Sequence, residues 1–296
     1  MKIAIFGGSG LLGSNLIKNY KNNGIEIKSF SRTIPNNIIN EDHHLIDFDN
    51  LNIELNNIFT IWKPDIIINT IALVNLQNCE ENYEEALNTN ATIAKTLSLT
   101  AKLHKSYFIH ISTDHFFNDS KKTHYETDEV SLLNNYAKTK YIAEKEVIST
   151  YPASLIVRTN IIGFRYNQVD SFFEWLIKAL KNNEKINLYN NYFTSPISVA
   201  ELSNILLLCY TKKLTGIFNI SSCEVINKFQ FGIMTAQKFG YSTQNIEKAT
   251  LSNSNTTIQR ALSLGLNVSK IENNLNIKMP TISETLHTLY KEFHEQ

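Results

Sequence analysis

Residues 2–13 of the chain read KIAIFGGSGLLG, and this stretch decides the fold. A short apolar run ends in Gly7, which is followed at intervals of three by Gly10 and Gly13, and helical periodicity begins at Leu11. Glycines at a junction of strand and helix allow a tight turn, the close approach of a pyrophosphate and close packing of the helix. The pattern predicts a dinucleotide site in a first β-α-β unit. The residues expected to face the cofactor are Gly7, Ser9, Gly10, Leu11, Leu12 and Gly13.

The alternation of strand and helix continues to about residue 158. We expect further strands near 25–30, 45–46, 65–69, 107–112 and 154–157, with helices near 51–62, 83–103 and 135–149. This alternation predicts an α/β fold of the Rossmann type, a doubly wound parallel sheet with helices on both faces.

The rhythm loosens beyond Arg158, which indicates a smaller, interleaved C-terminal α/β lobe for the substrate, mostly helical after Lys228. The expected division gives residues 1–160, with about 197–221, to an NADP-binding Rossmann domain. It gives about 161–196 and 222–296 to the substrate-binding lobe.

The composition excludes several classes of function. Basic and acidic residues number 28 each, so no overall charge recruits nucleic acid or a membrane surface, and a small-molecule substrate is expected. The glycine loop leaves no room for a signal peptide, and no apolar run approaches the ~20 residues of a membrane helix, which favours the cytoplasm. The three cysteines are too few for a disulfide framework, and the histidines lack companions at metal-ligand spacing, so no metal is expected.

The end of the second strand indicates which dinucleotide is bound. An acidic residue there would bind the ribose hydroxyls of NAD, but the chain has Ser31 and Arg32. A hydroxyl and a guanidinium suit a 2′-phosphate, so we predict NADP (NADPH). Asp47 and Phe48, after the third strand, are candidate contacts to the adenine, although a plain loop accounts for them nearly as well.

A catalytic group is expected around Tyr136 and Lys140, which lie four residues apart on one face of a helix. Delivery of a hydride to a ketone leaves an alkoxide that must be protonated, and a phenol with a pKa of about 10 is too weak an acid without a nearby cation. We therefore expect Tyr136 as the acid and Lys140 as the cation, which would also hold the nicotinamide ribose. Thr113, at the end of the preceding strand, would donate to the substrate oxygen.

The glycine loop, Tyr136-x-x-x-Lys140 and the preceding Ser-Thr-Asp at 112–114 resemble the extended short-chain dehydrogenase/reductases. Nearly the whole chain is similar to the dTDP-4-dehydrorhamnose reductase family. Further matches are Asn69–Ala72, Cys79-Glu80, Asn90, Phe116-Phe117, Glu126–Asp128, Thr194–Pro196, Arg260 and Ser269-Lys270. The resemblance implies NADPH-dependent reduction of the C4 ketone of a nucleoside-diphosphate 4-keto-6-deoxy sugar, for a polysaccharide. We expect Ala72 and Asn90 at the cofactor, and Thr113, Asp114, His115, Asn160 and Arg260 at the substrate.

The chain departs from the family pattern at places that concern the substrate. His115 stands where these reductases usually have tyrosine and the fucose-synthase branch has cysteine, so it is an acid or base, a sugar contact, or a loop histidine turned elsewhere. Leu132-Leu133-Asn134 replaces the proline expected before the catalytic tyrosine. Arg260, followed by alanine instead of proline, either clamps a diphosphate or forms a salt bridge in the lobe.

Three alternatives therefore stay open. One is an epimerase/reductase and another an epimerase/dehydratase of the same superfamily, each with His115 as an extra base. The third is a non-catalytic NADP-binding subunit, similar to the regulatory β subunit of methionine adenosyltransferase. Assembly into a homodimer is also left open.

Overall fold

The structure, a computed structural model, describes residues 1–33, 42–47, 51–119, 123–165, 169–252 and 258–295. These residues form two compact units. The first, which we call the Rossmann unit, comprises the described residues of 1–112, 134–157 and 205–217. The second, which we call the substrate unit, comprises those of 113–133, 158–204 and 218–296.

The boundaries differ from the predicted ones at 113–133, 158–160, 197–204 and 218–221, which belong to the substrate unit. Hydrogen bonds explain the placement of the first segment. The His124 amide donates to the Gly265 carbonyl over 2.9 Å, and the Glu126 carboxylate accepts from the Asn219 amide over 2.9 Å. This segment is therefore tied to residues more than ninety positions further along the chain.

The Rossmann unit is built on the predicted parallel sheet, whose strand order is β11-β6-β5-β4-β1-β2-β3. The strands are β1 (Lys2–Phe6), β2 (Glu26–Ser31), β3 (His43–Leu45), β4 (Ile66–Asn69), β5 (Tyr107–Ile111), β6 (Leu155–Arg158) and β11 (Gly216–Asn219). The order reverses at β1, which pairs with both β2 and β4. In open α/β sheets, ligands bind beyond the carboxyl ends of the strands at such a switch point.

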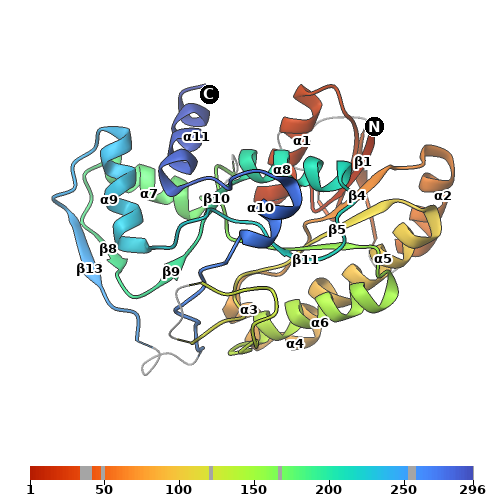
Figure 1. Cartoon of the computed structure of the whole chain (residues 1–296), viewed down its shortest axis with the longest axis horizontal. Helices are drawn as coiled ribbons and strands as arrows, with labels where there is room; N and C mark the ends of the chain where they lie inside the picture. The colour runs from red at the N-terminus through yellow and green to blue at the C-terminus, as the bar shows by residue number, and fades with distance from the viewer. Residues whose placement is uncertain (34–41, 48–50, 120–122, 166–168, 253–257, 296) are drawn as a thin grey trace. The chain divides into compact units, whose positions relative to one another are not determined.

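Helices cover both faces of this sheet. They are α1 (Leu11–Asn22), α2 (Leu51–Trp62), α5 (Ile93–His104), α6 (Asn135–Thr150) and α8 (Val199–Thr211). Figure 1 shows α5 and α6 side by side on one face and α1 on the other. Buried residues of α2, α5 and α6 share one core with the sheet, in which the rings of Phe6 and Phe30 stack 4.7 Å apart. Burial of this apolar stripe of each helix is what holds it against the strands.

The single helix expected over 83–103 is instead interrupted. The segment contains α4 (Tyr83–Leu87) and a π-helical turn, η1 (Asn88–Thr92), before α5, and another short helix, α3 (Leu76–Glu81), precedes it. The wider π turn accommodates Asn90, whose fully buried side chain bonds to both backbone groups of Leu73. Helical periodicity alone carries no sign of this polar anchor.

The substrate unit has its own apolar core. Its helices are α7 (Phe172–Lys181), α9 (Lys228–Phe239), α10 (Ser269–Leu275) and α11 (Ile282–His294). Its strands are β7 (Ile161–Ile162), β8 (Ile186–Tyr189), β9 (Phe193–Thr194), β10 (Ile197–Ser198), β12 (Ile226–Asn227) and β13 (Ile246–Ala249). The parallel pair β8 and β13 packs against α9, where a Cβ on Gly232 would lie 2.2 Å from Leu188 Cδ1. The part of the chain after Lys228, expected to be mostly helical, thus also contains the strand β13.

The described part of the chain contains no helix that is both long and apolar enough to cross a membrane.

Candidate active site

The glycine loop joins β1 to α1, as predicted, and it lies at the switch point of the sheet. Gly7 has φ +88°, and a Cβ there would lie 2.6 Å from Thr70 Oγ1 in the segment after β4. A Cβ on Gly13 would lie 2.2 Å from the Gly7 carbonyl oxygen. Side chains are thus excluded at both positions, because they would collide with the segment after β4 and with the backbone of the loop itself.

The first turn of α1 suits an anion. Gly10 occupies the N-cap position, and in this described stretch no side chain caps the helix and no acidic residue lies in its first turn. The amide groups of Leu11, Leu12 and Gly13 belong to the turn whose N–H groups have no partner within the helix. Their dipoles favour a phosphate, as the glycine spacing predicts.

The two residues predicted at the 2′-phosphate, Ser31 and Arg32, lie at the end of β2. Ser31 is buried, and its hydroxyl donates to the Thr33 carbonyl over 2.5 Å. That hydroxyl also lies 3.0 Å from Nε2 of His43, whose Nδ1 lies 2.6 Å from Ser29 Oγ. With its proton directed to Thr33, the Ser31 hydroxyl accepts from His43, and a contact of Ser31 with a 2′-phosphate stays a prediction. Arg32 is exposed, and its guanidinium is the positively charged group at the end of β2 that suits a 2′-phosphate.

The two candidate adenine contacts differ in what the structure says of them. Asp47 is exposed just after β3, and Phe48 lies outside the described residues. A contact between either residue and adenine stays a prediction.

Helix α6 begins at Asn135 and carries both predicted catalytic side chains near its N-terminus. Asn134 caps it, because its Oδ1 accepts from the Ala137 amide over 2.9 Å. This cap takes the place of the proline that the family pattern led us to expect. Tyr136 lies in the first turn, only 8% exposed, in a small cluster with Cys79 and Ala86, and Lys140 follows one turn later.

Lys140 is held against the end of β5. Its side chain is 1% exposed, and Nζ donates to the Ile111 carbonyl over 2.7 Å. Burial lowers the pKa of Lys140 to about 8, an effect partly offset by the Glu144 carboxylate. Glu144 is buried too and accepts from Ser112 Oγ over 2.6 Å. The Rossmann unit therefore places a lysine whose amine is less basic than usual at the carboxyl edge of the sheet.

Asn90 and Ala72 lie in the segments that follow β4. Asn90 Oδ1 accepts from the Leu73 amide over 2.7 Å. Its Nδ2 donates to the Leu73 carbonyl over 3.2 Å and to Thr139 Oγ1 over 2.9 Å. Both N–H groups of Asn90 are therefore engaged inside the protein, so this residue positions the segment after β4 against α6. Contact of Ala72, which is half-buried, with a cofactor stays a prediction.

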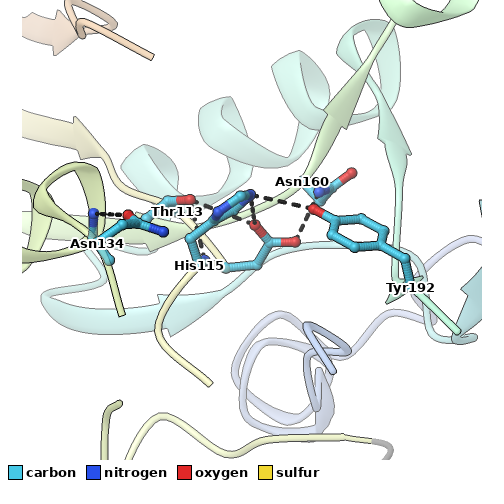
Figure 2. Close-up of polar contacts among 7 residues, drawn as sticks. Thr113, His115, Asn134, Asn160 and Tyr192 are labelled. Atoms are coloured by element: carbon cyan, nitrogen blue, oxygen red, sulfur yellow. Dashed lines mark hydrogen bonds and ion pairs between the residues drawn. The ribbon is translucent and has the colours of Figure 1, made fainter. Parts of the chain in front are cut away.

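The substrate unit gathers four of the predicted substrate residues (Figure 2). Thr113 Oγ1 accepts from the His115 amide over 3.2 Å, and Asp114 Oδ2 accepts from Asn160 Nδ2 over 2.7 Å. His115 Nε2 lies 3.9 Å from Asp114 Oδ1 and 3.5 Å from the Tyr192 hydroxyl. Burial raises the pKa of Asp114 and lowers that of His115. The loop histidine is thus turned into a polar cluster.

Two residues of this cluster carry no signal in the sequence. They are Tyr192 and Lys228, which belong to none of the sequence motifs. Lys228 Nζ lies 4.0 Å from the centre of the Phe172 ring. Burial lowers the pKa of Lys228 to about 8, partly offset by Asp114. Arg260 is exposed, and its charge, together with that of Lys228, adds to the lowering of the pKa of His115. In a chain rich in lysine, neither spacing nor rarity distinguishes Lys228.

Comparison with known proteins places these features in a family. Residues 1–295 match the family model described as the RmlD substrate binding domain. The chain belongs to the RmlD family.

Relatives of this RmlD-family chain include reductases and a subunit of a methionine adenosyltransferase. It is 24% identical to the probable low-salt glycan biosynthesis reductase Agl14 of Haloferax volcanii, over 98% of each chain. It is 23% identical to dTDP-4-dehydrorhamnose reductase of Aggregatibacter actinomycetemcomitans, over 94% of each. It is also 23% identical to the methionine adenosyltransferase 2 subunit beta of Danio rerio, over 92% of this chain and 84% of the other.

The same fold occurs in a solved structure of dTDP-4-dehydrorhamnose reductase from Bacillus anthracis in complex with NADP. The TM-score is 0.86 at 21% sequence identity, covering 98% of this chain and 99% of that one.

The buried cation of this RmlD-family chain should reduce its stability. Because the pKa of Lys140 is about 8 in the folded chain against an ordinary 10.5, the folded state binds fewer protons between these values, and stability rises with pH across them. Lys140→Met is expected to stabilise the ligand-free protein at neutral pH by on the order of 2 kcal/mol. Denaturant unfolding of both proteins at neutral pH and above pH 10.5 checks this, and the difference should shrink at the higher pH. A destabilised variant at neutral pH would contradict it.

Proposed function

We propose that this protein is an NADPH-dependent reductase of the C4 ketone of a nucleoside-diphosphate 4-keto-6-deoxy sugar, acting in polysaccharide biosynthesis. The observation that carries the proposal lies in the Rossmann unit. The glycine loop lies at the end of β1, and the buried Lys140 lies at the end of β5, at the same edge of the parallel sheet. Tyr136 lies one turn from Lys140 on α6. The dTDP-4-dehydrorhamnose reductases among the relatives support the class of substrate.

The residues present fit NADP. The loop has no room for a Cβ at Gly7 or Gly13, and the uncapped first turn of α1 suits the pyrophosphate. Arg32 would bind the 2′-phosphate, and Lys140 the hydroxyls of the nicotinamide ribose. The remaining candidates for this site are Ser9, Gly10, Leu11, Leu12, Asp47, Phe48 and Ala72. When bound, the cofactor supplies the hydride for the ketone carbon.

The side chains supply the proton and the polarisation. Thr113 would donate a hydrogen bond to the ketone oxygen, which makes the carbonyl carbon a better acceptor. Tyr136 would transfer its phenolic proton to that oxygen, which becomes the C4 hydroxyl of the product. The ammonium of Lys140 would stabilise the phenolate left behind. One hydride and one proton are thus added to the ketone.

The polar cluster of the substrate unit would recognise the rest of the substrate. Lys228 and Arg260 are cations suited to a diphosphate, and a guanidinium can bind two of its oxygens at once. Asp114, His115 and Asn160 offer hydrogen-bond donors and acceptors of the kind that bind sugar hydroxyls.

A direct assay tests the proposal. The purified protein should oxidise NADPH when a nucleoside-diphosphate 4-keto-6-deoxy sugar is added, with one alcohol formed per NADPH consumed. A thermal-shift panel of nucleotide sugars selects the substrate, because a ligand that binds only the folded protein raises its unfolding temperature. Absence of NADPH oxidation with every 4-keto sugar that binds would contradict the reductase.

The preference for NADPH should depend on Arg32. Arg32→Ala is expected to weaken NADPH binding about 10- to 100-fold, the loss of a charge-assisted hydrogen bond, and to leave NADH binding unchanged. Fluorescence titration with both cofactors measures the two affinities, and Arg32→Lys, which retains the charge, should give an intermediate result. An equal loss for NADH would show that Arg32 does not read the 2′-phosphate.

A second candidate within the superfamily rests on His115. Its position beside Asp114 and Tyr192 suits a base that removes a proton next to the keto carbon, as an epimerase requires. Incorporation of deuterium at that carbon in heavy water would favour this activity, and its absence during turnover would favour simple reduction.

A candidate of another class rests on the likeness to the methionine adenosyltransferase subunit. It predicts binding of NADPH without turnover of any nucleotide sugar, and a stable complex with a methionine adenosyltransferase catalytic chain.

A further inference from the structure

A buried polar line runs through the Rossmann unit and ends at Lys140. His110 of β5 has no exposed surface and lies between Asn69 of β4 and Lys140 of α6. Its Nδ1 is 3.1 Å from Asn69 Nδ2, and its Nε2 is 3.4 Å from Lys140 Nζ. The line begins at Ile71, whose amide donates to Asn69 Oδ1 over 3.0 Å.

The direction of each hydrogen bond follows from the start of this line. The Ile71 N–H can only donate, so the oxygen of Asn69 faces it and the NH₂ group of Asn69 faces His110. An NH₂ group can only donate as well, so Nδ1 of His110 must be the acceptor. A neutral imidazole has one lone pair and one N–H, and the N–H is therefore on Nε2, toward Lys140.

His110 stays neutral in this position. Burial, followed by the charge of Lys140, holds the pKa of His110 well below its ordinary value. The Nε2–H of a neutral ring opposes an ammonium, which has three donors and no acceptor, but it bonds readily to an amine, which has a lone pair. Nζ keeps a hydrogen for the Ile111 carbonyl in either form.

We infer that the Asn69–His110 pair shifts the equilibrium of Lys140 between ammonium and amine. The N–H that the pair presents favours the amine. His110 is thus a positioning residue that acts through Lys140. The inference rests on the proposed function, in which Lys140 serves Tyr136. After Tyr136 has protonated the substrate oxygen, a proton can pass from the Lys140 ammonium to the phenolate. The amine left behind accepts from His110 until a proton from water restores the ammonium, so each turnover takes up one proton.

The other charged groups around α6 leave this role to His110. Glu144 favours the ammonium and opposes His110, and Tyr136 lies on the same helix. On α3 and α4, Glu80 accepts from the Asn135 amide, the Cys79 thiol donates to the Leu73 carbonyl over 3.3 Å, Tyr83 is half-buried, and Glu81, Glu84 and Glu85 are exposed. On α5, Lys95 pairs with Glu146 at 2.8 Å, and Lys102 and His104 contact the Thr150 carbonyl and Asn56.

The unaltered protein gives the first test. Nitrogen-15 NMR of the imidazole ring distinguishes the two neutral tautomers of His110, and the Nε2–H form is expected at neutral pH. An Nδ1–H tautomer, or a protonated ring, would overturn the inference without any variant.

Two variants then test the effect on Lys140. His110→Phe removes the N–H, and Asn69→Leu frees the ring to turn its lone pair toward Lys140. Each should raise the titration midpoint of Lys140 by about 0.5–1 pH unit, the equivalent of one hydrogen bond. NMR of carbon-13-labelled lysine measures this midpoint, with Lys140→Met identifying the signal. Because both residues act through one contact, the double variant should shift the midpoint no further than a single one.

A matched control separates this effect from a loss of stability. Ser106→Ala removes another fully buried hydrogen bond, from Ser106 Oγ to the Pro64 carbonyl, and should leave the Lys140 midpoint unchanged. An unshifted midpoint in folded His110→Phe and Asn69→Leu would overturn the inference. The titration needs no substrate. A shifted midpoint in a protein that reduces no nucleotide sugar would therefore refute the proposed function. The inferred effect of the Asn69–His110 pair on the protonation of Lys140 would still hold.

Discussion

Tyr136→Phe is expected to lower kcat by about 10²- to 10⁴-fold, the usual contribution of a positioned general acid, while the affinity for NADPH is retained. The variant keeps the aromatic ring in its apolar cluster with Cys79 and Ala86 and removes only the hydroxyl that would protonate the substrate oxygen. Steady-state assays with the best nucleotide sugar give kcat, and fluorescence titration gives the NADPH affinity.

Tyr141→Phe provides the matched control. It makes the same substitution on the same helix, at a half-buried tyrosine five residues further on, and activity should be unchanged. If Tyr136→Phe retained full activity, Tyr136 would not be the acid. An equal loss in the two variants would indicate that damage to α6, and not removal of the acid, is being measured.

Gly13→Ala should have the largest effect on the fold of the loop. Alanine is the better helix former, by about 1 kcal/mol, so helix propensity alone predicts stabilisation. Its Cβ, however, would lie 2.2 Å from the Gly7 carbonyl oxygen and 2.8 Å from the Gly7 carbonyl carbon, which are backbone atoms. We expect a net loss of about 1–3 kcal/mol in the free energy of unfolding, the range for overpacking a tight site, together with loss of NADPH binding.

Gly10→Ala separates packing from ligand approach. A Cβ there meets the Gly7 carbonyl oxygen at 3.4 Å, an ordinary contact, and Gly10 has φ −82°. The ligand-free variant should unfold at nearly the same denaturant concentration as the parent, yet bind NADPH more weakly if the pyrophosphate lies on this turn. Equal stability of Gly13→Ala and Gly10→Ala would contradict the packing argument.

The sequence predicts the Rossmann unit well because its signals are local. Three glycines at a strand end and two side chains four residues apart need only the geometry of one turn and one helix. Asn90 shows the limit of this reasoning. Its partners, Leu73 and Thr139, are 17 and 49 residues away, and the polar anchor that interrupts the expected helix depends on both.

The substrate unit is less predictable for the same reason. Tyr192 lies 3.5 Å from His115, which is 77 residues away, and Lys228 and Asp114, more than a hundred residues apart, act on each other through their charges. Ser31 shows a different limit, since its position agrees with the prediction but its proton is committed to Thr33, which no pattern of residue types reveals.

The position of β11 in the chain has a consequence for synthesis. This edge strand of the sheet is formed by residues 216–219, and the Rossmann unit also includes 205–217. The segment 113–133 forms hydrogen bonds with Asn219 and Gly265, which are synthesised much later. At about 5–20 residues per second, the ribosome takes many seconds to reach these segments after the glycine loop has emerged. The Rossmann unit can be completed only after 113–133 and 158–204 of the substrate unit have been made, and the substrate unit only once 218–296 follow, so the nascent chain carries unpaired strand edges that can aggregate until then.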